Sequence, residues 1–322
     1  MFAAARDVHA APRETRSRQY EQFAASFDDR AYVDELSQRG FRWLARSDPA
    51  FPPLLGAIHD PPPGLFLRGA ADTRVLAAPS VAVVGARSCA DYGAHVARGL
   101  ARGLAAAGVV VVSGLARGVD GWAHRGALDA GRTTVAVLGC GIDRDYPRAH
   151  ARLAAEVAAA GLVVSEYPPG VAPAPWRFPA RNRIVAGLAR ATVVVEARER
   201  SGALITADLA LEEGRDVLAV PGEITSALSR GTNALLRLGA TVVTGPEDVL
   251  EVLGIARRPN EGNGGPAPGS PAAAALAALA DGAATADEIA RNARLDPAAT
   301  AGALVQLELA GVVTSQGGVY RR

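Results

Sequence analysis

The sequence predicts an α/β fold: a Rossmann-like, doubly wound, mostly parallel sheet followed by a C-terminal winged-helix domain. Between residue 80 and about residue 250, short runs of Val, Ile and Leu alternate with Ala-rich segments of helical period, which is typical of a parallel sheet covered by helices. A stretch rich in Gly, Pro and Asn then separates the last fifty residues. At 322 residues, 49% of them hydrophobic, the chain is long enough for one large and one or two small domains.

Residues 1–79 precede the predicted sheet. They combine a charged helical segment with two proline-rich stretches, Phe51-Pro-Pro and Asp60-Pro-Pro-Pro. Because proline fixes φ and lacks a backbone donor, these stretches are expected to pack as extended chain or turns. We therefore expect a short helical and proline-rich lead-in.

The sheet domain is expected over residues 80–256. Its strands are predicted at Val81–Val84, Val109–Ser113, Val135–Leu138, Leu162–Ser165, Val193–Glu196, Val217–Val220 and Thr241–Val243. Helices are expected between them, for example at His95–Ala107, His150–Ala160, Ala203–Glu213 and Thr232–Leu238. Residues 257–271 are expected to form a flexible linker.

Residues 272–322 are predicted to form the winged helix. The sequence indicates a helix over Ala272–Ala280, a second helix from Thr285 and a third after Pro297, followed by short strands at 312–314 and 318–320. In such domains the third helix enters a DNA major groove. This one has no basic residue, so we expect the domain not to hold a duplex.

The charge composition excludes several classes of protein. The chain has 34 basic and 33 acidic residues, and every basic residue is an arginine. Without lysine, a Walker A loop, a Schiff-base enzyme and a pyridoxal-phosphate enzyme each lack an essential residue. Because the net charge is only +1, any nucleic-acid site must be a local patch.

Cysteine usage and hydropathy indicate a cytoplasmic protein. Cys89 and Cys140 lie far apart without a Cys-x-x-Cys partner, as expected of free thiols in a reducing compartment. Residues 1–30 contain no apolar run, and the charge-free stretch near 262–280 is broken by glycines and prolines. We expect no signal peptide, no membrane contact and no cofactor.

The segment Pro173–Ile184, which is expected to form a loop after the predicted strand Leu162–Ser165, has a local excess of positive charge. It contains three arginines and two aromatics without an acid: Arg177, Arg181, Arg183, Trp176 and Phe178. Guanidinium groups pair with phosphate and aromatic faces stack on bases, so the segment suits a single nucleic-acid strand. The alternative is a solvated Arg-rich turn whose two aromatics pack into the core.

Two further loops follow predicted strands, at the edge where open α/β sheets bind ligands. Gly85-Ala86-Arg87 stands where a dinucleotide fingerprint would be, so NAD binding is not expected. The loop from Ser113 to Asp120 combines Gly114 and Gly118 with Arg117. Its backbone amides and guanidinium are predicted to cradle a phosphate; the alternative is that Arg117 pairs with Asp120.

Later loops extend the pattern. Arg200-Ser201-Gly202 and Thr206 lie at a helix start, where free amides and hydroxyls favour an anion. Asn233 follows the turn after the sixth strand. Together the loops predict an anion-accepting groove on one sheet edge. Its candidate DNA-binding residues are Gly85, Ala86, Arg87, Ser113, Gly114, Arg117, Gly118, Arg177, Phe178, Arg181, Asn182, Arg183, Arg200, Ser201, Gly202, Thr206 and Asn233.

Catalytic and metal signals are weak. Asp120 and His124 are spaced for one helix face but have no third ligand, so a structural Asp with a packed His is favoured over a metal site. Glu166, Glu196 and Glu223 end strands and could act as acid or base, although pairing with arginines explains them as well. We expect no catalytic residue.

An ordered series of short segments resembles the DNA-processing protein A family (DprA, also called Smf). The series includes Val-Gly-Ala-Arg87, Ser113-Gly-Leu-Ala-Arg-Gly-Val-Asp120, Tyr146-Pro147, Phe178-Pro-Ala-Arg-Asn-Arg-Ile184, Ser201-Gly-Ala-Leu-Ile-Thr206, Val220-Pro-Gly222 and Gly231-Thr-Asn233, and it spans residues 50–250. The tail resembles the winged helix of that family. The resemblance implies a non-enzymatic protein that binds and protects single-stranded DNA in natural transformation and recombination and helps load the RecA recombinase, usually as a homodimer through the Rossmann-like domain.

Carried over by position, the family's pocket falls on Arg87, on Phe178 with Arg181 and Asn182, and on the Ser201-Gly202 loop. Many members have a lysine where this chain has Pro175, so Arg177 is expected to supply that charge. The first loop also reads Gly-Ala-Arg in place of the commoner Gly-Ser-Arg, and the lead-in is shorter than the N-terminal helical domain of many relatives.

Two other classes of function remain open. Rossmann-like phosphoribohydrolases of nucleoside monophosphates share a Pro-Gly turn, but they need a Pro-Gly-Gly-x-Gly-Thr-x-x-Glu run, and Pro221-Gly-Glu-Ile does not continue that way. The other class is a protein-interaction scaffold with structural arginines. The three classes differ in what they do: a DNA-binding protein binds a strand without turnover, a phosphoribohydrolase hydrolyses AMP, and a scaffold does neither.

Overall fold

The computed structural model describes residues 21–23, 25–255, 266, 269–280, 282, 284–309 and 312–321. The chain divides into two compact units, one up to Arg257 and one from Arg258. Most of the expected linker, residues 257–271, lies outside the described residues.

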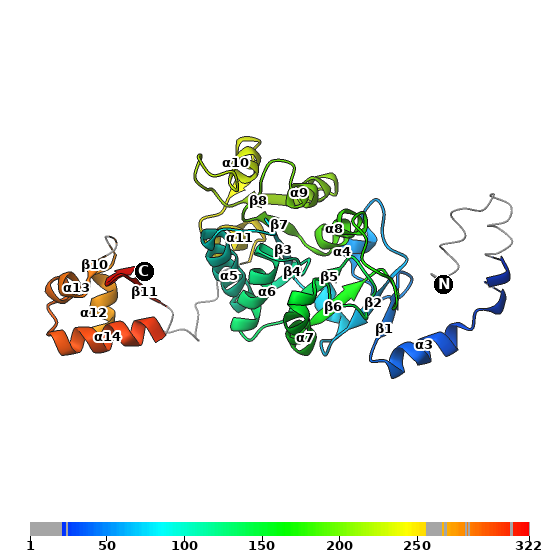
Figure 1. Ribbon diagram of the computed structural model, residues 1–322, viewed down its shortest axis with the longest axis horizontal. Helices are drawn as coiled ribbons and strands as arrows, with labels where there is room; N and C mark the ends of the chain where they lie inside the picture. The colour runs from blue at the N-terminus through cyan, green and yellow to red at the C-terminus, as the bar shows by residue number, and fades with distance from the viewer. Residues whose placement is uncertain are drawn as a thin grey trace. The chain divides into compact units, whose positions relative to one another are not determined.

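The first unit is built on a nine-stranded sheet with the order β1-β2-β6-β5-β4-β3-β7-β8-β9 (Figure 1). The strands from β3 to β9 are parallel to one another. Their bounds are β3 Ser80–Val84, β4 Val110–Ser113, β5 Thr134–Leu138, β6 Leu162–Ser165, β7 Ala191–Val194, β8 Asp216–Ala219 and β9 Thr241–Val242. The strand order reverses between β3 and β7, which confirms the doubly wound fold and makes this pair the topological switch point.

The side chains of each strand point alternately to the two faces of the sheet, and each face is covered by a layer of helices. In β3, Ala82 and Val84 belong to one core cluster, and Val81 and Val83 to another. Because both faces are covered, the strands are apolar throughout instead of alternating with polar residues. One face packs on α4 (Pro53–Gly56), α8 (Arg177–Leu188), α9 (Gly202–Glu212) and α10 (Arg230–Arg237); the other packs on α5 (Asp91–Ala106), α6 (Val119–Asp129), α7 (Ala151–Ala160) and α11 (Pro246–Val252).

Part of the expected lead-in belongs to the sheet. β1 (Arg42–Ala45) and β2 (Gly64–Arg68) form an antiparallel pair, and β2 joins β6 with Phe66 opposite Ser165. The expectation that residues 1–79 form a separate segment ahead of the sheet was therefore wrong for this region. The apolar run of β2 is buried and covers an edge of β6 that would otherwise expose unpaired backbone groups. Ahead of β1, α3 (Asp29–Gln38) buries Leu36.

The second unit is a winged helix, as the sequence predicts. It contains α12 (Pro271–Ala277), α13 (Ala286–Ala293) and α14 (Pro297–Leu309), with β11 (Thr314–Gln316), β12 (Val319–Arg321) and a short strand β10 (Ala284–Thr285) that was not expected. Thr285 caps α13, because its hydroxyl accepts the amide of Glu288 while the Glu288 carboxylate accepts the amide of Thr285 at 2.7 Å. Ile289, Leu304 and Leu307 lie in its core.

None of the described helices combines the length and the apolar character that a bilayer crossing requires.

Candidate nucleic-acid interface

Two adjoining cavities open at the carboxyl ends of the central strands. They have volumes of about 310 and 370 Å³, and we call them together the edge groove. Six residues line both: Arg87, Ser88, Gly114, Ala116, Phe178 and Arg181. The first cavity is completed mainly by Val84, Gly85, Ala86, Asp120, Pro179, Asn182, Val185, Arg198, Ser201, Gly202, Ala203, Thr206 and Leu228, and the second by Arg117, Gly139, Tyr146 and Pro147.

The position of the edge groove follows from the strand order. Gly85 to Ser88 come directly after β3, and the loop holding Arg198 and Ser201 follows β7. These two strands form the switch point, where the chain leaves in opposite directions and opens a crevice. The loops after β4 and β5 extend the crevice along the same edge.

Phe178 lies where the two cavities meet. Its ring stacks on Tyr146, with centroids 5.2 Å apart and planes at 26°, and the Arg87 guanidinium carbon lies 5.5 Å from its centroid. The ring is half-buried, so it is neither packed in the core nor freely exposed. Sequence analysis did not single out Tyr146 as a site residue, although the Tyr146-Pro147 pair is one of the segments that carry the family resemblance.

The segment that contains Phe178 is a helix, so the expectation of a loop here was wrong. α8 begins at Arg177, which places Pro179 in the first turn, where a missing amide leaves no hydrogen bond unmade. The helix start packs on Gly139, after β5. A Cβ at Gly139 would lie 2.9 Å from the Phe178 ring and 3.2 Å from the Arg177 carbonyl oxygen, so only glycine allows this approach.

Arg181 forms part of the groove floor. Its side chain is nearly inaccessible, at 4% exposure, and its Nη1 donates to the carbonyl oxygens of Gly114, at 2.8 Å, and Val137. Burial lowers the pKa of this guanidinium, and the charge of Asp120 opposes that shift. The expected phosphate contact of Arg181 is therefore withdrawn, because the side chain is buried and its Nη1 is bonded to two backbone carbonyl oxygens.

Asp120 supplies the counter-charge in the floor. Its Oδ2 accepts the amides of Gly114, at 3.1 Å, and Ala116, at 3.4 Å. Burial raises the pKa of this carboxyl group, and Arg181 lowers it. The amides expected to cradle a phosphate are thus already bound to a carboxylate. Arg117 does not pair with Asp120: it is exposed, and no ion pair found in the described part of the chain involves it.

The rim of the edge groove is cationic. Arg87, Arg117 and Arg198 are exposed and line it. Sequence analysis missed Arg198 and chose Arg200 instead. Arg200 is exposed, has a φ of 60° and lines neither cavity. The signal for Arg198 was available, because it lies four residues after the end of β7.

The start of α9 closes the first cavity. Ser201 precedes the helix, and its Oγ is buried without a hydrogen-bond partner. Asn182 Nδ2 and Thr206 Oγ1 both donate to the carbonyl oxygen of Gly202, at 3.1 and 3.3 Å. The Asn182 bond links α8 to α9, and the Thr206 bond lies within α9. Ser201, Gly202 and Ala203 line the first cavity at the start of this helix, a position that favours an anion.

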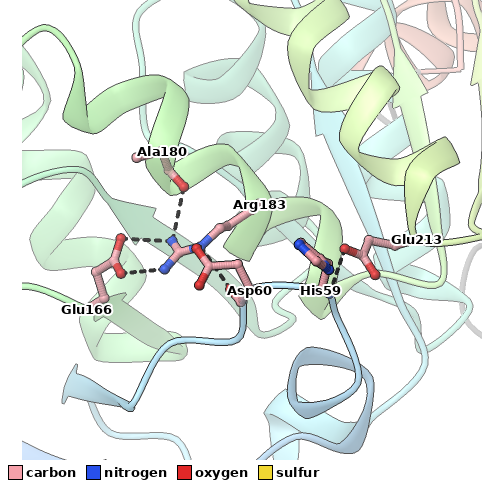
Figure 2. A network of polar contacts seen from close by, with 6 residues as sticks. All are labelled: His59, Asp60, Glu166, Ala180, Arg183 and Glu213. Carbon is pink, nitrogen blue, oxygen red and sulfur yellow. Dashed lines mark hydrogen bonds and ion pairs between the residues drawn. The ribbon is translucent and has the colours of Figure 1, made fainter.

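Arg183 lies outside the edge groove. Its guanidinium binds both carboxylate oxygens of Glu166, at 2.9 and 2.7 Å, and its Nε donates to Asp60 at 3.0 Å (Figure 2). The neighbouring His59 amide donates to the Glu213 carboxylate at 2.9 Å. The expectation of a DNA contact from Arg183 is corrected, because two carboxylates already neutralise it; Glu166 likewise acts as an ion-pair partner.

Three other candidates are bound within the fold. Ser113 Oγ donates to the Val83 carbonyl oxygen at 2.7 Å. Asn233 binds both backbone groups of Gly222, with its Nδ2 at 3.0 Å from the carbonyl oxygen. Gly118, with a φ of 73°, lets its loop pack against Ala86, whose carbonyl oxygen accepts the Val119 amide at 3.2 Å. None of the three candidates lines either cavity.

Arg177 lies beside the edge groove. Its Nη1 donates to the Ala172 carbonyl oxygen at 2.6 Å, and its guanidinium lies over the rings of Tyr167 and Trp176. It lines neither cavity.

His124 and Asp120 form hydrogen bonds to different groups of the protein. His124 Nδ1 lies 2.8 Å from Thr134 Oγ1, and burial lowers the pKa of the imidazole to about 3. Within the described ranges, no group of three or more His, Cys, Asp or Glu side chains could hold a metal ion.

Comparisons with known proteins identify the family. The family model described as "DNA recombination-mediator protein A" matches residues 42–254, and that of the "DprA winged helix domain" matches residues 261–319. The chain is 48% identical to the DNA processing protein DprA of Streptococcus pneumoniae, over 69% of this chain and 77% of that protein. It is 42% identical to a putative DNA processing protein DprA of Mycobacterium tuberculosis, over 98% and 87%.

Solved structures agree as well. DprA from S. pneumoniae superposes with a TM-score of 0.66 at 43% identity, covering 72% of this chain and 80% of that one. DprA from Helicobacter pylori, described with a single-stranded DNA binding mode, superposes with a TM-score of 0.60 at 32% identity, covering 66% and 95%. The chain therefore belongs to the DNA processing protein A family, DprA, also called Smf.

Proposed function

We propose that this protein binds single-stranded DNA in the edge groove, as a non-enzymatic DNA processing protein of natural transformation and recombination. The observation that supports this most strongly is Phe178, a half-buried ring in contact with Tyr146 and Arg87 where the two cavities meet. An aromatic platform beside a cationic rim matches the two parts of a single strand, its bases and its phosphates.

Charge placement supports binding without sequence readout. Three exposed arginines, Arg87, Arg117 and Arg198, are available for phosphates along the rim, and the free amides at the start of α9 offer one more anion site. The apolar contribution comes from ring faces, on which every base can stack. Of the original candidates we keep for direct contact Gly85, Ala86, Arg87, Arg117, Phe178, Asn182, Ser201, Gly202 and Thr206.

We further propose a homodimer through the free end of the sheet. Between β8 and β9, and in β9 itself, large apolar side chains are exposed: Ile224 at 90%, Leu238 at 86% and Val242 at 48%. Apolar side chains beside a free strand edge favour pairing with a second copy. The Leu238→Glu variant is expected to halve the molar mass measured by light scattering, while an unchanged mass would contradict this face.

Loading of a recombinase is the proposed cellular role. It is supported by membership of the family. In a reconstitution, RecA filament formation on strands covered by single-strand-binding protein should accelerate when this protein is added.

The binding proposal is tested with fluorescently labelled oligonucleotides in single- and double-stranded form. Tight binding of the single strand, weak binding of the duplex and no release of adenine from AMP would support it. Equal affinity for both forms would contradict the stacking argument, and AMP hydrolysis would favour the phosphoribohydrolase class.

A further inference from the structure

Trp176 is an exposed aromatic side chain beside the edge groove. Its residue is 61% exposed and is the N-cap of α8. The Arg177 guanidinium carbon lies 4.6 Å from the centroid of the Trp176 ring and 5.2 Å from that of Tyr167, which is buried. We call these three residues the Trp176 cluster.

The Trp176 cluster holds the indole in place. Arg177 Nη1 donates to the Ala172 carbonyl oxygen at 2.6 Å, and its position over two rings links the exposed Trp176 to the buried Tyr167. An indole fixed by its neighbours loses little conformational entropy when a ligand stacks on it. The contacts in this cluster leave most of the Trp176 surface open to solvent.

The strand order puts the loop that leads to Trp176 at one end of the series of groove loops. Along the sheet, the loops follow β7, β3, β4, β5 and β6 in that order. The first four of these strands are followed by residues that line the two cavities: Arg198, Arg87, Arg117 and Tyr146. The loop after β6 ends at Trp176, two residues before Phe178. Trp176 itself lines neither cavity, so a strand reaches it only where it leaves the edge groove past the start of α8.

The charge of this region fits a nucleic acid better than a protein partner of mixed charge. Residues 167–184 contain no acid, so a phosphodiester can approach without repulsion from this segment. A ring face accepts any base, which agrees with a groove that does not read sequence.

We propose that Trp176 is a second stacking platform, which binds the base of a nucleotide that leaves the edge groove beyond Phe178. This inference rests on the proposed single-strand binding and deepens it, because it adds one nucleotide position and fixes the end of the groove at which the strand leaves.

The test uses the full chain and three variants, Trp176→Ala, Trp176→Phe and Trp122→Phe. Trp122 is the matched control, because it also lies against arginines, Arg98 at 5.8 Å and Arg125 at 5.0 Å, but belongs to α6 on the opposite face of the sheet. Binding is measured by anisotropy with oligothymidylates of increasing length, and indole emission is recorded during each titration.

With long oligonucleotides, Trp176→Ala should weaken binding by about fivefold or more, the effect of losing one stacked base. The loss should vanish for the shortest oligonucleotide that still binds. Trp176→Phe should stay within about threefold of the wild type, since a ring remains. DNA should quench the indole emission of the wild type and of Trp122→Phe, and much less that of Trp176→Phe.

Failure of the inference is distinguishable from failure of the proposed function. Wild-type protein that binds no single strand would overturn both. If the wild type binds and the folded Trp176→Ala variant binds equally well at every oligonucleotide length, the platform alone is overturned. Trp176 would then serve a protein partner. If Trp176→Ala does not fold, the emission of Trp176→Phe decides: quenching equal to the wild type would reject the platform.

Discussion

Arg183 and Glu166 form a two-point ion pair, with Nη1 to Oε1 at 2.9 Å and Nη2 to Oε2 at 2.7 Å. Both side chains are mostly buried, at 17% and 12% exposure. Glu166 directly follows β6, and Asp60 joins the same guanidinium from the segment before β2. The pair thereby fixes α8, the helix that carries Phe178, to two other parts of the sheet domain.

Replacing Arg183 should therefore affect folding and leave the electrostatics of DNA binding unchanged. Arg183→Ala removes hydrogen bonds to a charged group and leaves Glu166 without its partner, so the free energy of unfolding should fall by about 2 kcal/mol, as measured by urea denaturation. Arg74→Ala is the control, because its partner Asp72 is exposed, and it should have no measurable effect. A flatter salt dependence of strand binding in Arg183→Ala would instead place Arg183 on a phosphate.

Phe178→Ala should weaken single-strand binding by about fivefold or more, since stacking contributes about 1–3 kcal/mol per base. The melting temperature should change little, because the ring is half-buried and contacts Tyr146 and Arg87 at the rim. Anisotropy titrations and thermal denaturation measure the two effects. Unchanged affinity together with a collapsed fold would assign Phe178 to the core.

Arg87→Ala should reduce the slope of log affinity against log salt by about 0.7, the value for one lost phosphate contact with a single strand. Arg198→Ala should do the same, whereas Arg200→Ala should leave the slope unchanged, since Arg200 lines neither cavity. Equal slopes for wild type and Arg87→Ala would remove Arg87 from the interface.

Buried His124 should make folding stability sensitive to acid. Burial is the main cause that lowers its pKa from 6.5 to about 3, and the charges of His150, Arg125 and Arg181 lower it further. Below pH 6.5 the unfolded chain binds a proton that the folded chain does not, so stability is complete above that pH and falls between about pH 6.5 and 3. The slope contributed by His124 is about 1.4 kcal/mol per pH unit.

Urea denaturation of the wild type and of His124→Gln between pH 7 and 5 measures this contribution. The variant is expected to show a shallower loss of unfolding free energy on acidification, even if its stability at pH 7 is lower. Parallel curves for the two proteins would show that His124 does not titrate differently on folding.

Deleting residues 258–322 should leave single-strand affinity within about threefold. The second unit has a core of its own, and every residue that lines the edge groove lies in the first unit. α14 also has no basic residue to add to binding. A large loss of affinity in a truncated protein that remains folded would mean that the winged helix grips the strand.

The sequence predicted the parallel strands because apolar runs bounded by Gly and polar residues are a strong signal. It misplaced β7 by two residues, at Val193–Glu196 instead of Ala191–Val194, because Ala191–Val195 is a continuous run without an alternating pattern. β1 and β2 were missed because prolines surround them. They extend the sheet by pairing with the edge of β6, and that edge exists only once the sheet has formed, so a local sequence pattern does not reveal it.

The site was predicted by location better than by residue. The predicted strand ends located the site at the correct edge of the sheet. The helix α8 was not predicted, so the face on which each of its side chains lies was not predicted either. Phe178, Arg181, Asn182 and Val185 line the first cavity at spacings of three, four and seven residues, which is one face of a helix. Arg183 does not share that face, and a segment taken as a loop gives no reason to separate Arg181 from Arg183.

The Asp120 carboxylate that accepts the Gly114 and Ala116 amides has a consequence for how the strand is released. In the proposed binding mode, Asp120 and Arg181 neutralise each other in the groove floor, so most phosphate contacts would form at the rim, where water and counterions screen them. Attachment then consists of several weak, individually breakable links. On this proposal, a competing binder displaces the strand one nucleotide at a time.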